Sequence, residues 1–184
     1  TSQQLARLTE DDKQLVLPDG TAITASASVR NLGVQIDENL RMDEQVAMCR
    51  RLCYYHMRRI RQVRHLLDSS SLRALVVAFV LGRIDYCNSL YAGCTQAVLQ
   101  GLQRVQSTAA KLLTGTGRLE SALPLMRDLH WLPVSSQIQY KLCTLMYDVV
   151  HGIAPGYLRD LCRPCEDMRL RSGSRGDYVV PFSP

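Results

Sequence analysis

The sequence predicts a mainly α-helical bundle preceded by a small β-hairpin and strand element. From residue 43 onward, apolar residues recur at spacings of three and four, the period of an amphipathic helix. Before residue 40, short apolar runs flank turn sequences such as Pro18-Asp19-Gly20. Of the 184 residues, 46% are apolar and 21% are charged, so the chain can bury a core and is not disordered as a whole.

The β element is expected within residues 1–40. Leu15–Leu17 and Ile23 lie on either side of the Pro18-Asp19-Gly20 turn and should pair as a hairpin. The segment Leu32–Ile36 alternates apolar residues with other types, which predicts a short strand that ends at Asp37. These residues are followed by the first helical pattern.

The first helix is expected from Asp43 to Leu67, and the carboxylates of Asp43 and Glu44 favour its amino terminus. Its predicted buried face has spacings of three and four residues and consists of Cys49, Leu52, Cys53, His56, Ile60, Val63 and Leu67. A break follows at residues 68–71, where a serine should cap the next helix.

Further helices are expected along the rest of the chain. One runs from Leu72 to about Tyr91, and another begins after Thr95 and ends at Gly115 and Gly117. Three shorter patterns follow, at 123–129, 133–152 and 155–161. The predicted organisation is therefore a β element at 1–40, an Arg-rich helical segment at 41–94, a C-terminal helical segment at 95–162 and a disordered tail at 163–184.

Charge is distributed unevenly. Residues 1–45 contain four basic and eight acidic residues, whereas residues 46–184 contain 18 basic and nine acidic residues. Six of the basic residues lie between Met48 and Leu67, a stretch without an acidic residue: Arg50, Arg51, Arg58, Arg59, Arg61 and Arg64. Together with Tyr54 they predict a nucleic-acid-binding helix face, because Arg binds phosphate and Tyr can stack on a base or sugar. The alternative is a solvated helix face.

Cysteine usage favours an intracellular protein, which we expect in the nucleus and the cytoplasm. The count of seven is odd, and no Asn-x-Ser/Thr acceptor is present. Cys49, Cys53 and His56 share one helix face and could form a metal half-site, but a core position explains them more simply. The pair Cys162 and Cys165 has only His151 as a nearby additional ligand, so metal binding there stays open.

No membrane span and no catalytic constellation are predicted. The most apolar stretch, Leu72–Leu81, has ten residues and contains Arg73, whereas a span needs roughly 20 apolar residues. A polymerase or nuclease needs carboxylates that converge on metal ions, and the only adjacent pair, Asp11-Asp12, lies in a polar run. Because the chain starts at Thr1 rather than Met, we expect a fragment or a processed product.

Five strings occur in an order and spacing that resemble one family. They are Val29–Asp37, Arg83–Leu90, Ala109–Thr116, Leu129–Val134 and His151–Leu158. Together, over about residues 13–180, they are similar to the C-terminal part of the reverse transcriptase of LINE-type (non-long-terminal-repeat) retrotransposons. The resemblance implies an RNA-directed DNA polymerase as the parent protein.

The resemblance also implies roles for individual segments. Asn31, Leu32 and Gly33 would belong to the primer-grip element, at the end of the palm domain. The helices after them would form a thumb that holds the backbone of the RNA–DNA template–primer duplex. The palm itself, with its magnesium-binding aspartates, is absent, so the chain is expected to bind RNA and RNA–DNA hybrid without a cofactor and without catalysing by itself.

Two other functions are left open. The chain could be a truncated or domesticated retrotransposon remnant that serves as a helical protein-interaction module, with the apolar helix from Leu72 as its contact surface. An intact metal-dependent nuclease or polymerase is the third reading, and the missing carboxylate cluster speaks against it.

Overall fold

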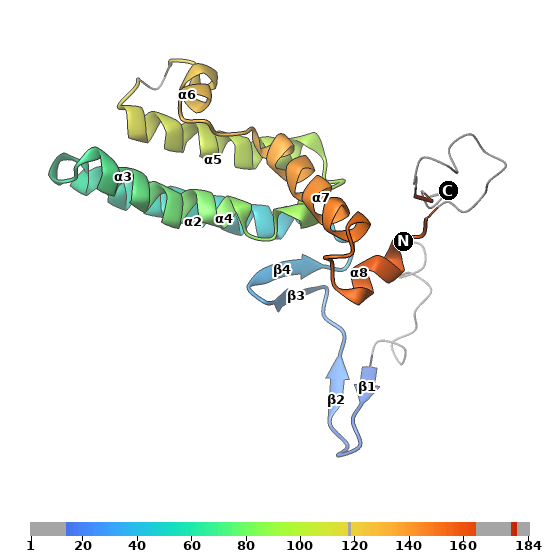
Figure 1. Cartoon of the computed structure of the whole chain (residues 1–184). Helices are drawn as coiled ribbons and strands as arrows, with labels where there is room; N and C mark the ends of the chain where they lie inside the picture. The colour runs from blue at the N-terminus through green and yellow to red at the C-terminus, as the bar shows by residue number, and fades with distance from the viewer. Residues whose placement is uncertain (1–13, 118, 165–177, 180–184) are drawn as a thin grey trace. The chain divides into compact units, whose positions relative to one another are not determined.

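The structure is a computed structural model that describes residues 14–117, 119–164 and 178–179. It is a mainly α-helical fold with two small antiparallel sheets at its amino-terminal end (Figure 1). The fold class predicted from the sequence is therefore confirmed. The chain divides into two compact units, Thr1–Ile138 and Gln139–Pro184.

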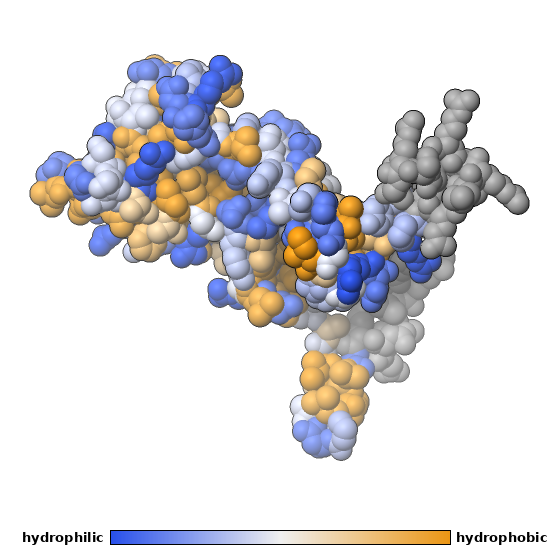
Figure 2. Space-filling view, viewed as in Figure 1, coloured by the Kyte–Doolittle hydropathy of each residue, from blue (hydrophilic) through white to orange (hydrophobic). Residues whose placement is uncertain are grey.

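The first sheet is a hairpin of β1 (Gln14–Val16) and β2 (Ala22–Thr24), in which Leu15 pairs with Ile23. Its turn is the one predicted at Pro18-Asp19-Gly20, and Gly20 adopts a φ of 84°. The Thr21 amide donates to the Asp19 side chain over 2.9 Å. Both strands are exposed, and their apolar side chains form the orange surface of this hairpin in Figure 2.

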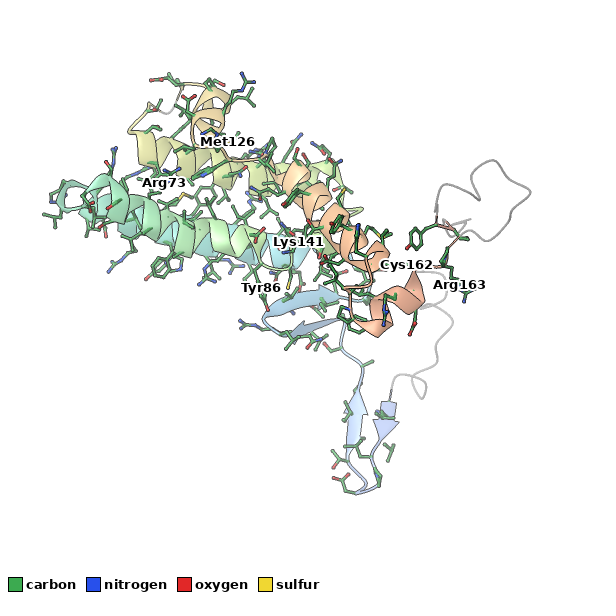
Figure 3. All side chains as sticks on the ribbon, viewed as in Figure 1. Arg73, Tyr86, Met126, Lys141, Cys162 and Arg163 are labelled. Atoms are coloured by element: carbon green, nitrogen blue, oxygen red, sulfur yellow. The ribbon has the colours of Figure 1, made fainter. Side chains whose placement is uncertain are left out.

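The second sheet is a hairpin of β3 (Ser28–Asn31) and β4 (Val34–Asp37). The strand predicted to begin at Leu32 begins at Val34, because Leu32 and Gly33 form the turn with φ values of 47° and 85°. Two consecutive positive φ values are typical of a two-residue hairpin turn. The Tyr86 hydroxyl donates to the Leu32 carbonyl over 2.7 Å, as its side chain reaches the tip of this hairpin (Figure 3).

Asp37 joins the second hairpin to the first long helix. Its carboxylate accepts hydrogen bonds from the backbone amides of Asn39, Arg41 and Met42 over 3.1, 3.0 and 2.8 Å. The bond from Arg41 lowers the pKa of Asp37 most. These bonds hold a connection in which Leu40 and Met42 adopt left-handed backbone conformations.

The predicted first helix is confirmed as α2 (Asp43–Val63), followed by the 3₁₀ turn η2 (Arg64–Leu66). Its buried apolar residues are Val46, Cys49, Cys53, Met57 and Ile60. The predicted buried face was therefore too wide. Leu52 and Val63 are 37% and 41% exposed and lie at the edges of the stripe, whereas Met57 was missed.

The predicted second helix is divided into several pieces. They are α3 (Ser69–Val76), the π-helical turn η3 (Val77–Leu81), α4 (Gly82–Asp85) and the 3₁₀ turn η4 (Asn88–Tyr91). The helix ends before Tyr86, and Cys87 has a φ of 54°. The N-cap of α3 is Asp68, whose side chain accepts from the Ser71 amide over 3.3 Å, so the predicted serine cap is wrong.

The Asp68 cap makes α3 sensitive to acid. Hydrogen bonds from Ser70 and Ser71 lower the pKa of Asp68 from 3.8 to about 2. Because the folded-state pKa lies below that of the unfolded chain, the cap stabilises the fold above about pH 4, and this contribution is lost as the pH falls through about 2. We expect Asp68→Ala to lower the midpoint of thermal unfolding at pH 7 and to lower it much less at pH 2, where about half of the Asp68 side chains are protonated. An equal decrease at both pH values would contradict this assignment.

The remaining helices of the first unit complete its core. They are α5 (Gln96–Thr114), α6 (Ala122–Asp128) and the beginning of α7 (Val134–Val150). Gly115 ends α5 with a φ of 75°, as predicted. The core lies between α2, the α3–α4 segment and α5, and it includes Leu102, Val105 and Ala109, all fully buried.

Two glutamines attach the end of this unit to α5. The Gln103 side chain accepts from the Val134 amide and the Gln106 side chain donates to the Leu132 carbonyl, each over 2.9 Å. Gln106 is 1% exposed and bonded to Gln103 over 3.0 Å, so the pair is a satisfied buried network.

The second unit holds the rest of α7 and α8 (Gly156–Leu161). The turn between the helices uses Gly152 at a φ of 71°, and the amides of Ile153 and Ala154 donate to the Asp148 carbonyl. Most of the tail predicted at 163–184 lies outside the described residues. Within the described part of the chain, no helix is both long and apolar enough to cross a membrane.

Candidate nucleic-acid interface

Helices α2 and α5 run side by side in the same direction (Figure 1). Two contacts define their alignment: the Arg50 side chain lies against Gly101, and the Arg64 side chain lies against Gly115. In both contacts the α5 residue is 51 positions further along the chain. The helices are therefore parallel and in register over at least four turns.

A groove with a volume of about 950 Å³ lies between these two helices. One wall comes from α2 and its carboxyl-terminal end, and the other comes from α5 and the residues after it. The groove is lined by Tyr54, Met57, Arg58, Arg61, Arg64, Arg104, Ser107, Thr108, Lys111, Leu112, Gly115 and Thr116. We call this surface the basic groove.

The basic groove combines five cations with no acidic lining residue among the described part of the chain. Arg58, Arg61 and Arg104 are exposed, and Arg64 and Lys111 are half-buried. The only ion pair between described side chains, that of Arg41 with Asp43 over 3.2 Å, lies at the start of α2. Like charges gathered without carboxylates repel one another and attract a polyanion.

Neutral groups that can hydrogen-bond accompany the cations. Ser107 and Thr108 lie on the α5 wall, and Thr108 donates to the Arg104 carbonyl over 2.8 Å. Thr116 lies at the end of the groove and is hydrogen-bonded to Thr114 over 2.6 Å. Tyr54 lines the opposite wall and is 40% exposed, so its ring can contact a base or a sugar.

The structure brings only part of the predicted site together. Tyr54, Arg58, Arg61 and Arg64 line the basic groove. Arg50 lies outside it, half-buried against Gly101, and its Nε is buried without a hydrogen-bond acceptor. Arg51 and Arg59 are exposed on α2 and do not line the groove. The predicted primer-grip residues Asn31, Leu32 and Gly33 form the end of β3 and the hairpin turn.

The α5 wall was missed by the sequence analysis. Arg104, Ser107, Thr108 and Lys111 recur at spacings of three, one and three, which places them on one helix face. This polar stripe beside the apolar stripe of α5 is the signal that could have identified them. It was weak because the two cations are seven positions apart in an otherwise ordinary amphipathic helix.

The cysteines near α2 belong to the core. Cys49 and Cys53 are buried with their sulfurs 4.0 Å apart, and the Cys53 thiol contacts the Val80 carbonyl. The Cys49 contact and burial raise the pKa of Cys53, which disfavours a reactive thiolate. The His56 ring stacks on Phe79, with centroids 5.1 Å apart.

No metal-binding group of three or more His, Cys, Asp or Glu side chains is found in the described ranges. Cys162 contacts the Met146 sulfur over 3.9 Å, and its predicted partner Cys165 lies outside those ranges. Magnesium prefers carboxylate and water oxygens, and the described lining of the basic groove has five cations and no carboxylate. No catalytic step is therefore assigned to this groove.

Comparisons with known proteins add no identification. The chain matches no protein-family model, no curated protein and no solved structure. The basic groove and the residues that form it are therefore the features from which a function can be inferred.

Proposed function

We propose that the chain is a thumb-like segment of an RNA-directed DNA polymerase, which holds the sugar–phosphate backbone of an RNA–DNA hybrid without catalysing by itself. The observation that carries this proposal is the basic groove, in which cations from two helices line one surface and none of the described lining residues is acidic. The resemblance to LINE-type reverse transcriptases supports the choice of hybrid as ligand. The proposed setting is the nucleus and the cytoplasm, together with a palm domain that supplies the magnesium site.

The chemistry of the groove suits binding without base readout. Guanidinium groups form bidentate hydrogen bonds with phosphate oxygens, and hydroxyl groups such as that of Ser107 can add neutral contacts. Backbone contacts carry no sequence information by themselves. A polymerase that copies any template requires this kind of binding.

The structure gives less support to the alternative role as a protein-interaction module. Its expected contact surface was the apolar helix from Leu72, but Leu72, Val76 and Val80 are buried in the core of the first unit. Self-association through these side chains would require the core to open. The basic groove, by contrast, is accessible in the folded chain.

Salt dependence of binding tests the proposal. We expect the affinity for a hybrid of about 20 base pairs, measured by fluorescence anisotropy, to fall with a slope of log affinity against log salt of about −4 to −5. This value corresponds to about 0.9 for each of four or five phosphates neutralised. A slope near zero, or equal affinity for a neutral polymer of the same length, would contradict the proposal.

A further inference from the structure

The contacts at Gly101 and Gly115 mark two points on the seam between α2 and α5. A Cβ atom on Gly101 would lie 3.1 Å from Cδ of Arg50 and 3.4 Å from its Nε. A Cβ atom on Gly115 would lie 2.7 Å from Nη2 of Arg64. The distances of 3.1 and 2.7 Å are shorter than ordinary van der Waals contact between heavy atoms. At Gly101 the Arg50 side chain occupies the space that a Cβ atom would fill. At Gly115 the φ of 75° already favours glycine, and the contact is with the flexible end of Arg64.

Gly101 is unexpected at its position. It lies inside α5 and is buried, where glycine destabilises a helix relative to alanine. The buried Nε of Arg50 without an acceptor is a second unfavourable feature at the same place. Gly101 lets the Arg50 side chain of α2 approach α5 closely, but the buried Nε of Arg50 gains no hydrogen bond from the fold, which makes Arg50 a candidate for a role in binding.

The cations follow one another along the seam. With the 51-residue offset between the helices, their order is Arg50, Arg104, Arg58, Lys111, Arg61 and Arg64. The two end positions are 14 residues apart on α2, which corresponds to about 21 Å of helix. Phosphates of one duplex strand recur about every 3.4 Å along the helix axis. A strand laid along the seam follows its own backbone, on which consecutive phosphates are further apart, so this length spans fewer than about six phosphates.

The width of the seam limits what can enter it. The axes of two packed helices are about 8–10 Å apart and their side chains fill the space between them, so a strand would lie along the outside of the seam, and a whole duplex would not fit between the cations on its two sides. A hybrid would therefore present one of its two strands to the seam. A free single strand would meet the same cations.

We propose that the α2–α5 seam is a track for the backbone of one nucleic-acid strand, about 21 Å long, and that Gly101 is a positioning residue for Arg50 at one of its ends. This inference rests on the proposed function and extends the site beyond the basic groove to Arg50. The proposed ligand is the continuous row of phosphates on one strand, and not the phosphates of both strands of a duplex.

A length series of single strands tests the track. We expect the affinity of the full chain for oligothymidylates of two to twelve phosphates, at 0.1 M salt, to rise about fivefold with each added phosphate until the strand spans the seam, and only slightly thereafter. In Arg50→Ala the rise should end one phosphate earlier. A steady rise to twelve phosphates would overturn the proposed length. Binding of hybrid without binding of any single strand would overturn the track while leaving the proposed function intact, and failure to bind either would contradict both.

A double-mutant cycle tests whether Gly101 positions Arg50. We expect Gly101→Ala to keep the helix content of the protein and to lower its affinity for a six-phosphate strand about fivefold, as Arg50→Ala does. The double variant should be no weaker than either single variant, because both changes remove the same contact. Gly156→Ala is the matched control, since a Cβ there meets nothing within 4 Å. Unchanged affinity of Gly101→Ala, or additive losses in the double variant, would overturn the positioning role.

Discussion

Replacing Arg58, Arg61 and Arg104 with glutamate is expected to weaken binding of RNA–DNA hybrid at least about 500-fold at 0.1 M salt. Each arginine lines the basic groove, and each lost phosphate contact contributes about 0.9 logarithmic units at this salt concentration. The slope of log affinity against log salt should become shallower by about 3 units. The loss should decrease as salt is raised, since screening weakens attraction and repulsion alike.

The fold should tolerate these three changes. All three side chains are exposed, and none has an ion-pair partner among the described residues. Surface substitutions of this kind usually change the free energy of unfolding by less than about 0.5 kcal/mol. Circular dichroism and thermal unfolding would show whether the variant remains folded, so that weakened binding can be attributed to the groove.

A matched variant tests whether the basic groove or the overall charge of the chain determines the affinity for hybrid. Arg51, Arg59 and Arg73 are also exposed, lie on α2 and α3, and do not line the groove. Changing these three arginines to glutamate alters the net charge by the same amount. We expect a much smaller loss of affinity, and an equal loss in both variants would show that the groove is not the binding site.

The two walls of the basic groove differ in how readily they could be predicted. The α2 wall was found because six arginines without a carboxylate are unusual on one helix. The α5 wall depends on tertiary structure: Arg104 and Lys111 face the same groove only because α5 packs parallel to α2. Helix periodicity assigns a face to each residue, but it does not say which helix will be the neighbour.

The division of the second predicted helix has a similar origin. Its sequence contains no proline, and its apolar pattern continues through the region where the helix ends. The end is set by one contact with another segment and by local burial: the Tyr86 hydroxyl reaches the Leu32 carbonyl, and Asn88, which is 2% exposed, donates to Asp85 at the end of α4 over 2.9 Å. Local propensity is a weak guide where such contacts decide the backbone conformation.

Among the substitutions proposed for this chain, Leu102→Ala is expected to have the largest effect on stability. The Leu102 side chain is fully buried in the core, on the face of α5 that also carries Val105, Ala109 and Leu112. Leu102→Ala is expected to lower the free energy of unfolding by about 2–5 kcal/mol, through lost apolar burial and the cavity that remains. Because domains of this size are stable by about 5–15 kcal/mol, urea denaturation at 25 °C should show a clear shift of the midpoint.

Two control substitutions test whether Leu102→Ala acts through the loss of a buried side chain. Leu102→Met keeps most of the side-chain volume and should cost less than about 1.5 kcal/mol. Leu90→Ala removes a side chain that is 44% exposed and should cost less than the buried change. If Leu102→Ala cost no more than Leu90→Ala, the assignment of this α5 face to the core would be wrong.

Leu102→Ala and the groove variant should affect different quantities. At a temperature where Leu102→Ala is still folded, its basic groove keeps all five cations, so its affinity for hybrid and its salt slope should match those of the unmodified chain. The variant of Arg58, Arg61 and Arg104 should show the reverse, with weakened binding and unchanged stability. A loss of affinity in Leu102→Ala below its unfolding transition would indicate that the parallel packing of α2 and α5, and not only the charge on them, sets the strength of binding.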